Sequence, residues 1–292
     1  MNSKAHVALK MDREIVDFLS QHGSFPSIKD REDEIINAEE RLANKLVQMQ
    51  AGLEAKFIQA LRDRGSLPSN NQQQMKVISD ILDIPFNEMK QVISDQGVDV
   101  AEIGRQLTFD DMVQQGLEIS ATGFNENVKQ ELAEKIYTFS DDTFNRIQGD
   151  FAKTLSSAYE DGIGIDDAAR RLRTDFKGLR DHRLKNIART EIQGAQNEGS
   201  QRTMEEVGTE YKQWITVNDG RVRGNDSDDM YDHTVLHGEV VKVNESFSNG
   251  LKYPGERSGA MGQWINCRCR ERPYIPRRTE NIITTPYYPS AA

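Results

Sequence analysis

Cysteine is scarce in this 292-residue sequence, which contains only Cys267 and Cys269. Two cysteines separated by one residue would form a strained disulfide, so a disulfide framework is excluded and a reducing compartment is expected. Apolar residues make up 36% of the chain, against about 45–50% in ordinary globular proteins when glycine is counted. This shortage favours long, exposed helices over a thick globular core.

Long hydrophobic runs are missing as well. No run approaches the roughly 20 apolar residues of a membrane-spanning helix, and the N-terminus lacks the basic and apolar regions of a secretory signal. We therefore expect a soluble protein. The sequence also lacks a nucleophile elbow, an H-E-x-x-H motif, a Walker A loop and a glycine-rich dinucleotide fingerprint. We expect no enzymatic activity.

Charge is unevenly distributed along the chain. Its 37 basic and 47 acidic residues leave a net charge of −10, which argues against a protein whose whole surface binds nucleic acid or anionic lipid. Residues 1–169 hold 17 basic and 30 acidic side chains, whereas residues 170–292 hold 20 and 17. The two parts of the chain are therefore expected to have different partners.

Helical periodicity dominates the N-terminal region. From Asp30 to Arg64 apolar residues recur every three or four positions, which predicts one long amphipathic helix that ends at Gly65. Pro85 suits the first turn of a new helix better than a helix interior. Further helices are predicted over about 72–82, 98–118 and 126–160.

Two more helices are predicted after Gly162 and Gly164. Asp166 or Asp167 is placed to cap the first of them. The second spans about 181–207 and is followed by a glycine that suits a helix end. The chain up to residue 207 is therefore expected to be almost wholly helical.

Strand patterns follow the last helix. Tyr211 to Val217 alternates apolar and polar residues, 238–243 contains another strand-like run, and N-D-G at 218–220 signals a turn. The predicted fold is α+β, with an elongated, mostly α-helical N-terminal region, a small α+β domain with an antiparallel sheet, and an extended C-terminal tail. The predicted domains are 1–165, 166–275 and 276–292.

Several short motifs occur in a distinctive order in the second part of the chain. They are A-R-T-E (188–191), Asn197, Trp214, D-G-R-V-R (219–223), H-T-V-L-H-G (233–238), P-G-E (254–256) and N-C-R-C (266–269). In this order they resemble the phage head morphogenesis family, the Mu F-like minor head proteins. The resemblance extends from Asp166 to Pro273. Trp264 departs from it, because many relatives place a histidine there.

The resemblance implies a bacteriophage minor head protein, a capsid component that binds the portal, takes part in head morphogenesis and viral DNA packaging, and leaves with the genome. The portal protein is the first implied partner, followed by the major capsid or scaffolding protein and packaged DNA. The implied location is the virion, in the capsid interior near the portal, after assembly in the host cytoplasm. The acidic helical region suits partner helices and the basic region suits DNA.

Polar residues on and after the 181–207 helix form a candidate structural clamp. Its members are Arg189, Glu191, Asn197, Asp219 and Arg221. Arginines that bond carboxylates or carbonyl groups would join the helix to the sheet. The alternative is a metal-assisted or acid–base hydrolase acting on nucleic acid or cell wall, with Glu191, Asp219 and His233 in acid–base roles.

Four side chains form a candidate metal site. His233, His237, Cys267 and Cys269 match tetrahedral zinc in number and ligand type. Cys-x-Cys would need a turn to aim both sulfurs at one ion. In the alternative, the cysteines pack as small apolar residues and the histidines make ordinary hydrogen bonds. We expect packing without a cofactor, and zinc remains the alternative.

Basic residues around and after the cysteines form a candidate contact with nucleic acid or a protein partner. They are Arg268, Arg270, Arg272, Arg277 and Arg278. A salt-sensitive contact of these arginines with DNA or with an acidic portal surface is a third interpretation of the C-R-C segment.

Overall fold

The computed structural model describes residues 28–117, 119, 122–217, 222–224 and 229–276. The chain divides into two compact units, each built from separate stretches of sequence. The helical unit comprises Asn37–Val100 and Asn125–Ala195. The described residues of the sheet unit fall within Met1–Ile36, Ala101–Phe124 and Gln196–Ala292.

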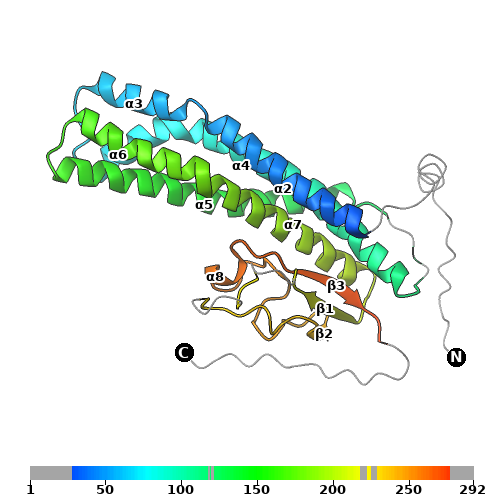
Figure 1. Ribbon diagram of the computed structural model, residues 1–292. Helices are drawn as coiled ribbons and strands as arrows, with labels where there is room; N and C mark the ends of the chain where they lie inside the picture. Colours follow the sequence, from blue (N-terminus) through cyan, green and yellow to red (C-terminus); the bar gives the residue numbers. More distant parts are fainter. Residues whose placement is uncertain (1–27, 118, 120–121, 218–221, 225–228, 277–292) are drawn as a thin grey trace. The chain divides into compact units, whose positions relative to one another are not determined.

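Helices make up most of the described chain (Figure 1). They are Ile28–Gln50 (α2), Leu53–Arg64 (α3), Asn71–Gln114 (α4), Glu126–Glu160 (α5), Ile165–Gly178 (α6), the π-helical Leu179–Arg183 (η1) and Leu184–Glu206 (α7). The expected helicity up to residue 207 is confirmed for the described residues, and α5 matches the prediction over 126–160. Asn125 caps α5, because its side chain accepts a hydrogen bond from the Val128 N–H (3.1 Å).

The predicted single helix between Asp30 and Arg64 is wrong, because the chain forms two helices, α2 and α3, that part at Gly52. Gly52 has a φ of 85°, a left-handed conformation that glycine adopts without the steric cost of a Cβ. The apolar period continues through this break, so the pattern alone does not show it. Gly65 ends α3 as predicted, with its N–H bonded to the Arg62 carbonyl group (3.0 Å).

Pro85 lies inside α4. The predicted boundary between one helix over 72–82 and a new helix at Pro85 is therefore wrong, and the residues predicted as a separate helix from 98 continue the same element. An interior proline costs about 3 kcal/mol because it removes a hydrogen-bond donor. Leu82 and Phe86 are buried at 0% and 1% exposure, and burying such a side chain contributes about 1.5–3 kcal/mol. Burial along this face offsets the cost.

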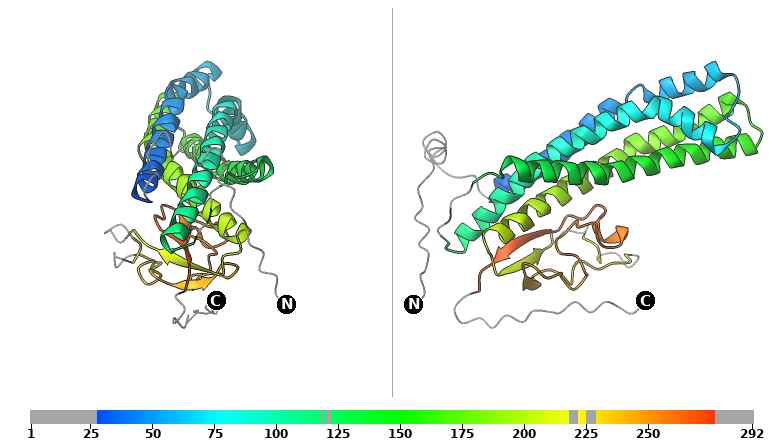
Figure 2. Two further views of the ribbon diagram at one scale, coloured as in Figure 1. Left: turned by 90° about the vertical axis from the view of Figure 1, so that its right-hand side faces the viewer. Right: turned by 180° about the vertical axis from the view of Figure 1, so that it is seen from behind.

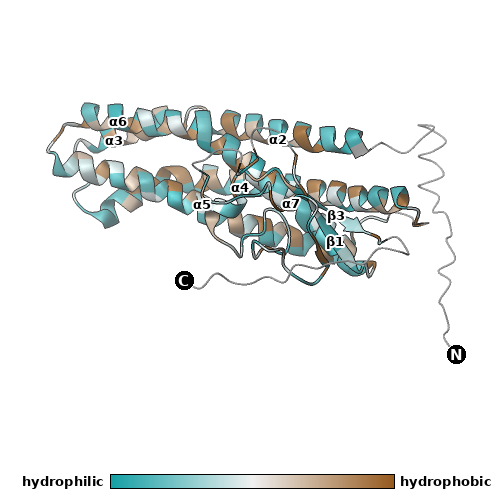
Figure 3. Cartoon of the chain, turned by 60° about the horizontal axis from the view of Figure 1, so that its bottom comes forward, coloured by the Kyte–Doolittle hydropathy of each residue, from teal (hydrophilic) through white to brown (hydrophobic). Residues whose placement is uncertain are grey.

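The helical unit has an aromatic core. Phe57 of α3, Phe151 of α5 and Phe176 of α6 pack together with ring centroids 4.6 to 6.0 Å apart. In a second contact, the rings of Phe86 and Phe144 lie 4.8 Å apart. Figure 3 shows how hydrophilic and hydrophobic residues alternate along the helices. Burial of the apolar faces is what joins these helices.

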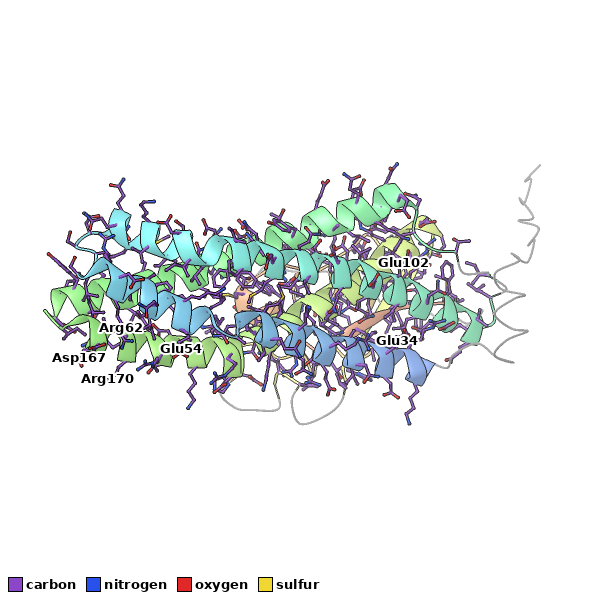
Figure 4. The ribbon with its side chains drawn as sticks, turned by 90° about the horizontal axis from the view of Figure 1, so that it is seen from above. Glu34, Glu54, Arg62, Glu102, Asp167 and Arg170 are labelled. Carbon is purple, nitrogen blue, oxygen red and sulfur yellow. The ribbon has the colours of Figure 1, made fainter. Side chains whose placement is uncertain are left out.

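The helix α6 begins after Gly164, which provides no side-chain cap. The predicted capping by Asp166 or Asp167 is therefore wrong. Both acidic residues lie in the first turn of α6, where their charge complements the partial positive charge of the helix N-terminus. Asp166 also pairs with Arg62 of α3 at 2.8 Å. Figure 4 shows Arg62, Asp167 and Arg170 at the same end of the helices.

Three short antiparallel strands form a sheet in the order β2-β1-β3. They are Tyr211–Ile215 (β1), Val240–Lys242 (β2) and Arg270–Tyr274 (β3), and the four-residue helix Met261–Trp264 (α8) precedes β3. Lys212 lies opposite Val241 of β2 and Pro273 of β3. The predicted α+β class is confirmed. The predicted strand segments contain β1 and β2, whereas the charged, proline-containing β3 was not predicted.

Two glycines allow α4 and α7 to approach closely within the sheet unit. A Cβ on Gly104 would lie 2.0 Å from the Gln196 carbonyl oxygen, and a Cβ on Gly199 would lie 2.0 Å from that of Ala101. Ser200 Oγ donates a hydrogen bond to the Gly104 carbonyl group (3.1 Å). The two backbones are therefore so close that a side chain at either glycine would displace the other helix.

Several sequence predictions concern features that the structure leaves open. The domain boundaries at residues 165 and 275 stay predictions. The N-D-G turn at 218–220 and the tail from residue 277 onward lie outside the described residues. In the described part of the chain, no helix has both the length and the apolar character needed to cross a membrane.

Candidate functional site

Asn197 on α7 binds the start of β3 through both ends of its side-chain amide. Its Nδ2 donates to the Cys269 carbonyl oxygen (3.0 Å), and its Oδ1 accepts from the Glu271 N–H (3.1 Å). Asn197 is fully buried. The end of α7 lies along the sheet in the views of Figure 2. Asn197 therefore joins helix to sheet as the clamp hypothesis requires.

The other predicted clamp residues have different surroundings. Arg189 pairs with Glu39 of α2 (2.8 Å) inside the helical unit. Glu191 is buried at 4% exposure in the same unit. Asp219 and Arg221 lie outside the described residues. The structure thus gives Asn197 a helix-to-sheet contact, and gives Arg189 a helix-to-helix contact.

His233, Cys267 and Cys269 come together in the sheet unit and are called the Cys/His cluster below. The sulfur of each cysteine lies 3.7 Å from the same His233 atom, Nδ1. One potential ligand atom from each residue lies within 4.8 Å of the others. All three side chains are buried, at 1 to 3% exposure. The structure therefore brings together three of the four predicted metal ligands.

The fourth predicted ligand, His237, is outside the Cys/His cluster. Its Nδ1 accepts a hydrogen bond from the Thr216 N–H (3.2 Å), and the Thr216 hydroxyl group lies 2.9 Å from the same atom. His237 is exposed, whereas His233 is buried. Leu236, between the two histidines, joins the apolar core of the sheet unit. Of these two histidines, His233 is the one that faces the two sulfurs.

Residues around the Cys/His cluster orient the His233 ring. His233 Nε2 lies 3.1 Å from the side-chain oxygen of Gln263 on α8. The Trp214 ring stands edge-on to the His233 ring, with centroids 5.5 Å apart. Trp214 also packs edge-on against Phe247 (5.0 Å) and is fully buried. Sequence analysis missed Gln263, because nothing in a lone glutamine indicates that it faces a histidine 30 residues away.

The two thiol groups of the Cys/His cluster change each other's ionisation. Contact with the Cys269 thiol group, assisted by contact with the His233 ring, holds the pKa of Cys267 well below its usual range despite burial. The same contact between the sulfurs, together with burial, raises the pKa of Cys269. Cys267 is therefore the cysteine favoured as a thiolate, the form that binds metals and reacts as a nucleophile.

A second buried group of charged residues lies on the sheet, and sequence analysis missed it. Lys212 Nζ donates to the Gln201 side chain (2.9 Å) and lies 4.0 Å from Glu271 Oε2. Burial raises the pKa of Glu271 to about 8 and lowers the pKa of Lys212. Because side chains alternate along β1, Lys212 lies on the same face of the strand as Trp214. This alternation was a usable sequence signal that Lys212 is buried.

Two of the predicted contact arginines bond within the sheet unit. Arg270 pairs with Asp111 of α4 (2.8 Å), and Arg272 donates to the Gln213 side chain of β1 (2.7 Å). Arg268 is half-buried. Arg277 and Arg278 lie outside the described residues. Contact with DNA by these arginines stays a prediction, and two of them have structural roles.

The structure describes two of the three residues of the alternative hydrolase site, Glu191 and His233. Glu191 belongs to the helical unit and His233 to the sheet unit, while Asp219 lies outside the described residues. The His233 side chain is buried and faces two sulfurs. A general acid or base needs access to the proton that it transfers, and the hydrolase alternative stays a prediction.

The fold and the site define an α+β protein whose small sheet unit contains a polar helix–sheet joint and a buried Cys/His cluster. A family model described as "Phage Mu protein F like protein" matches residues 149–272. The predicted resemblance to the Mu F-like family is confirmed over this segment, which supports a phage head morphogenesis protein. No curated protein and no solved structure matches the chain.

Proposed function

We propose that this chain is a bacteriophage minor head protein that associates with the portal, takes part in head morphogenesis and DNA packaging, and is ejected with the genome. The observation that carries the proposal is the match of residues 149–272 to the Mu F-like family. That segment contains the end of α5, the helices α6 and α7, and almost the whole sheet. The protein is then a virion component, located inside the capsid near the portal, and it assembles in the host cytoplasm.

The proposed role is structural and does not involve turnover. The residues that would carry acid–base chemistry are poorly placed for it, since Glu191 and His233 are only 4% and 1% exposed. Buried polar groups that bond within the protein contribute to a unique fold. The helices of the chain suit contacts with partner helices, because they expose many charged residues around an apolar core.

Among the implied partners, we favour the portal protein over DNA as the molecule that the chain binds. Arg270 and Arg272 contact Asp111 and Gln213 within the chain, so the arginine contact with DNA has fewer available donors than the sequence suggests. The net charge of −10 also disfavours broad contact with phosphates. The major capsid or scaffolding protein is a further candidate partner during assembly.

The proposal is tested by co-sedimentation of the full-length chain with the assembled portal oligomer of the same phage. The chain should sediment with the portal, and mass spectrometry of purified heads should detect it in fewer copies than the major capsid protein. Cross-linking of the full-length complex would then locate the contact. Repetition at rising salt separates a charged contact, which weakens with salt, from an apolar one.

A matched control uses portal protein that has not assembled into its oligomer. If a folded chain neither sediments with the assembled portal nor occurs in purified heads, the proposal is wrong. A chain that sediments with DNA but not with the portal would overturn the priority given to the portal.

A further inference from the structure

We infer that His233, Cys267 and Cys269 bind a zinc ion, which joins the segment around residue 233 to the segment that leads into β3. The inference concerns a structural metal site and is independent of the role of the chain in the phage head. It rests on the distances within the Cys/His cluster, the orientation of the histidine, and the fold around the cysteines.

The distances fit a shared metal ion. Tetrahedral zinc with bonds of about 2.3 Å to sulfur and 2.0–2.1 Å to nitrogen separates a sulfur and a nitrogen ligand by about 3.6 Å. Both sulfurs lie 3.7 Å from His233 Nδ1. An imidazole nitrogen has one lone pair or one hydrogen, so it can form a good hydrogen bond with only one of them. A central cation interacts with all three atoms.

The histidine presents the correct nitrogen to such an ion. His233 Nε2 lies 3.1 Å from the side-chain oxygen of Gln263, which only accepts hydrogen bonds. The proton of the neutral ring is therefore placed on Nε2, and the Nδ1 lone pair points toward the two sulfurs. Histidine ligands of metals commonly donate their other N–H to an oxygen in this way. Gln263 would act as a positioning residue for the ligand.

The backbone provides the turn that Cys-x-Cys requires. Asn266, directly before Cys267, has a φ of 54°, in the left-handed region that residues other than glycine seldom adopt. Arg223 donates to the backbone carbonyl groups of Gln263 (3.3 Å) and Ile265, which supports the same segment. The turn lies between α8 and β3, so neither cysteine is confined to a strand. Both sulfurs can therefore face one side.

The sheet unit has little regular structure around the Cys/His cluster. Its strands have five, three and five residues, and α8 has four. Small folds of this kind are often stabilised by a bound metal, because binding free energy adds directly to folding free energy. Zinc suits this ligand set, since thiolate and imidazole ligands disfavour calcium and magnesium. The sequence has only two cysteines, so a donor other than cysteine completes the tetrahedral site.

The first experiment measures metal in the full-length chain. Protein purified under reducing conditions and without chelators should contain about one equivalent of zinc by elemental analysis. Removal of zinc should lower the unfolding temperature, and zinc should restore it. Titration of the metal-free chain with cobalt should produce the visible absorption of a tetrahedral site together with thiolate-to-metal charge transfer. This measurement needs no substitution and so does not depend on the folding of a variant.

Variants then assign the ligands. Cys267→Ser, Cys269→Ser and His233→Gln should each abolish stoichiometric binding, whereas His237→Gln should retain it and serves as the matched histidine control. Gln263→Ala should weaken zinc binding about 10–100-fold in competition with a chelating dye, because such supporting contacts typically affect affinity by this amount. Far-UV circular dichroism of each variant checks that the helices are retained.

Two results would overturn the inference. The first is a reduced, folded wild-type chain that contains no zinc and takes up neither zinc nor cobalt at micromolar concentration. The second is full zinc content in both Cys267→Ser and His233→Gln, which would assign the binding to a site other than the Cys/His cluster.

Discussion

At the scale of single residues, stability depends on a few buried polar side chains. Asn197 contacts two backbone groups, the N–H of Glu271 in β3 and the carbonyl group of Cys269, which directly precedes β3. Lys90 is buried on α4, pairs with Asp141 of α5, and lies 5.2 Å from the centre of the Tyr137 ring. Burial removes the polar groups of Asn197 and Lys90 from hydrating water. Their contacts within the protein therefore determine whether their burial stabilises the fold.

We predict that Asn197→Ala lowers the free energy of unfolding by about 2–4 kcal/mol, because it leaves a buried carbonyl group and a buried N–H without their partner. The control is Asn186→Ala on the same helix. Asn186 is exposed, and its replacement should change stability by less than about 0.5 kcal/mol. Urea denaturation of both variants provides the measurement. Equal stability of the two variants would show that Asn197 does not act as a clamp.

The Lys90–Asp141 pair should contribute a pH-dependent stability. The hydrogen bond from Lys90 lowers the pKa of Asp141 below its usual value of 3.8. At pH values between the lowered pKa and 3.8, the unfolded chain therefore binds more protons than the folded chain. The stability from the pair is therefore fully present above about pH 4 and is lost as the pH falls through the lowered pKa.

Asp141→Asn should consequently be less stable than wild type at pH 7, and the difference should shrink as the pH falls below 4. The exposed neighbour Asp142 provides the control substitution, Asp142→Asn, which should show no comparable difference. Thermal unfolding from pH 7 to pH 3 provides the measurement. A difference between Asp141→Asn and wild type that stays constant over this range would contradict the prediction.

At the scale of secondary structure, replacing a glycine by alanine is expected to raise or lower stability according to the backbone conformation of the glycine. Gly52 separates α2 from α3 with a φ of 85°, whereas Gly149 lies inside α5. A Cβ at either position would meet no atom within 4 Å. The two sites therefore differ in backbone conformation and not in available space, which makes them a matched pair.

We predict that Gly52→Ala lowers stability by about 1 kcal/mol, because alanine is strained in the left-handed conformation. Gly149→Ala should raise stability by about 0.5–1 kcal/mol, because alanine is favoured over glycine in a helix interior. Chemical denaturation of the two single variants measures both effects. Changes of the same sign would show that backbone conformation does not control these positions.

At the scale of the whole molecule, each compact unit has its own buried core. The helical unit is centred on aromatic side chains from α3, α5 and α6. The sheet unit has an apolar core that includes Trp214, Leu236, Val241 and both cysteines. In both units the residues that meet in the core come from distant parts of the chain.

Phe151→Ala should destabilise the protein by about 3–5 kcal/mol, because it removes a large side chain from the contact of three helices and leaves a cavity. The aromatic control is Tyr159→Ala on the same helix, where the side chain is 46% exposed. That change should cost less than about 1 kcal/mol. Calorimetric unfolding of the full chain can compare them, and a small loss for Phe151→Ala would contradict the proposed core.

The sequence by itself determined the features that depend on local pattern. The period of 3.6 residues identified α5, the glycine at position 65 marked the end of α3, and alternation over Tyr211–Ile215 identified β1. The ordered motifs identified the family over the segment that the family model matches. Each of these signals lies within a few residues or in the order of residues along the chain.

Only the tertiary structure decided the features that depend on distant partners. Helix α4 continues through Pro85 because its flanking residues are buried, and β3 forms because β1 offers a partner strand. His233 faces the sulfurs while His237 faces Thr216, although both histidines occur in one short motif. Packing and pairing energies from residues far along the chain outweighed local preference at these positions, so no local pattern could reveal the outcome.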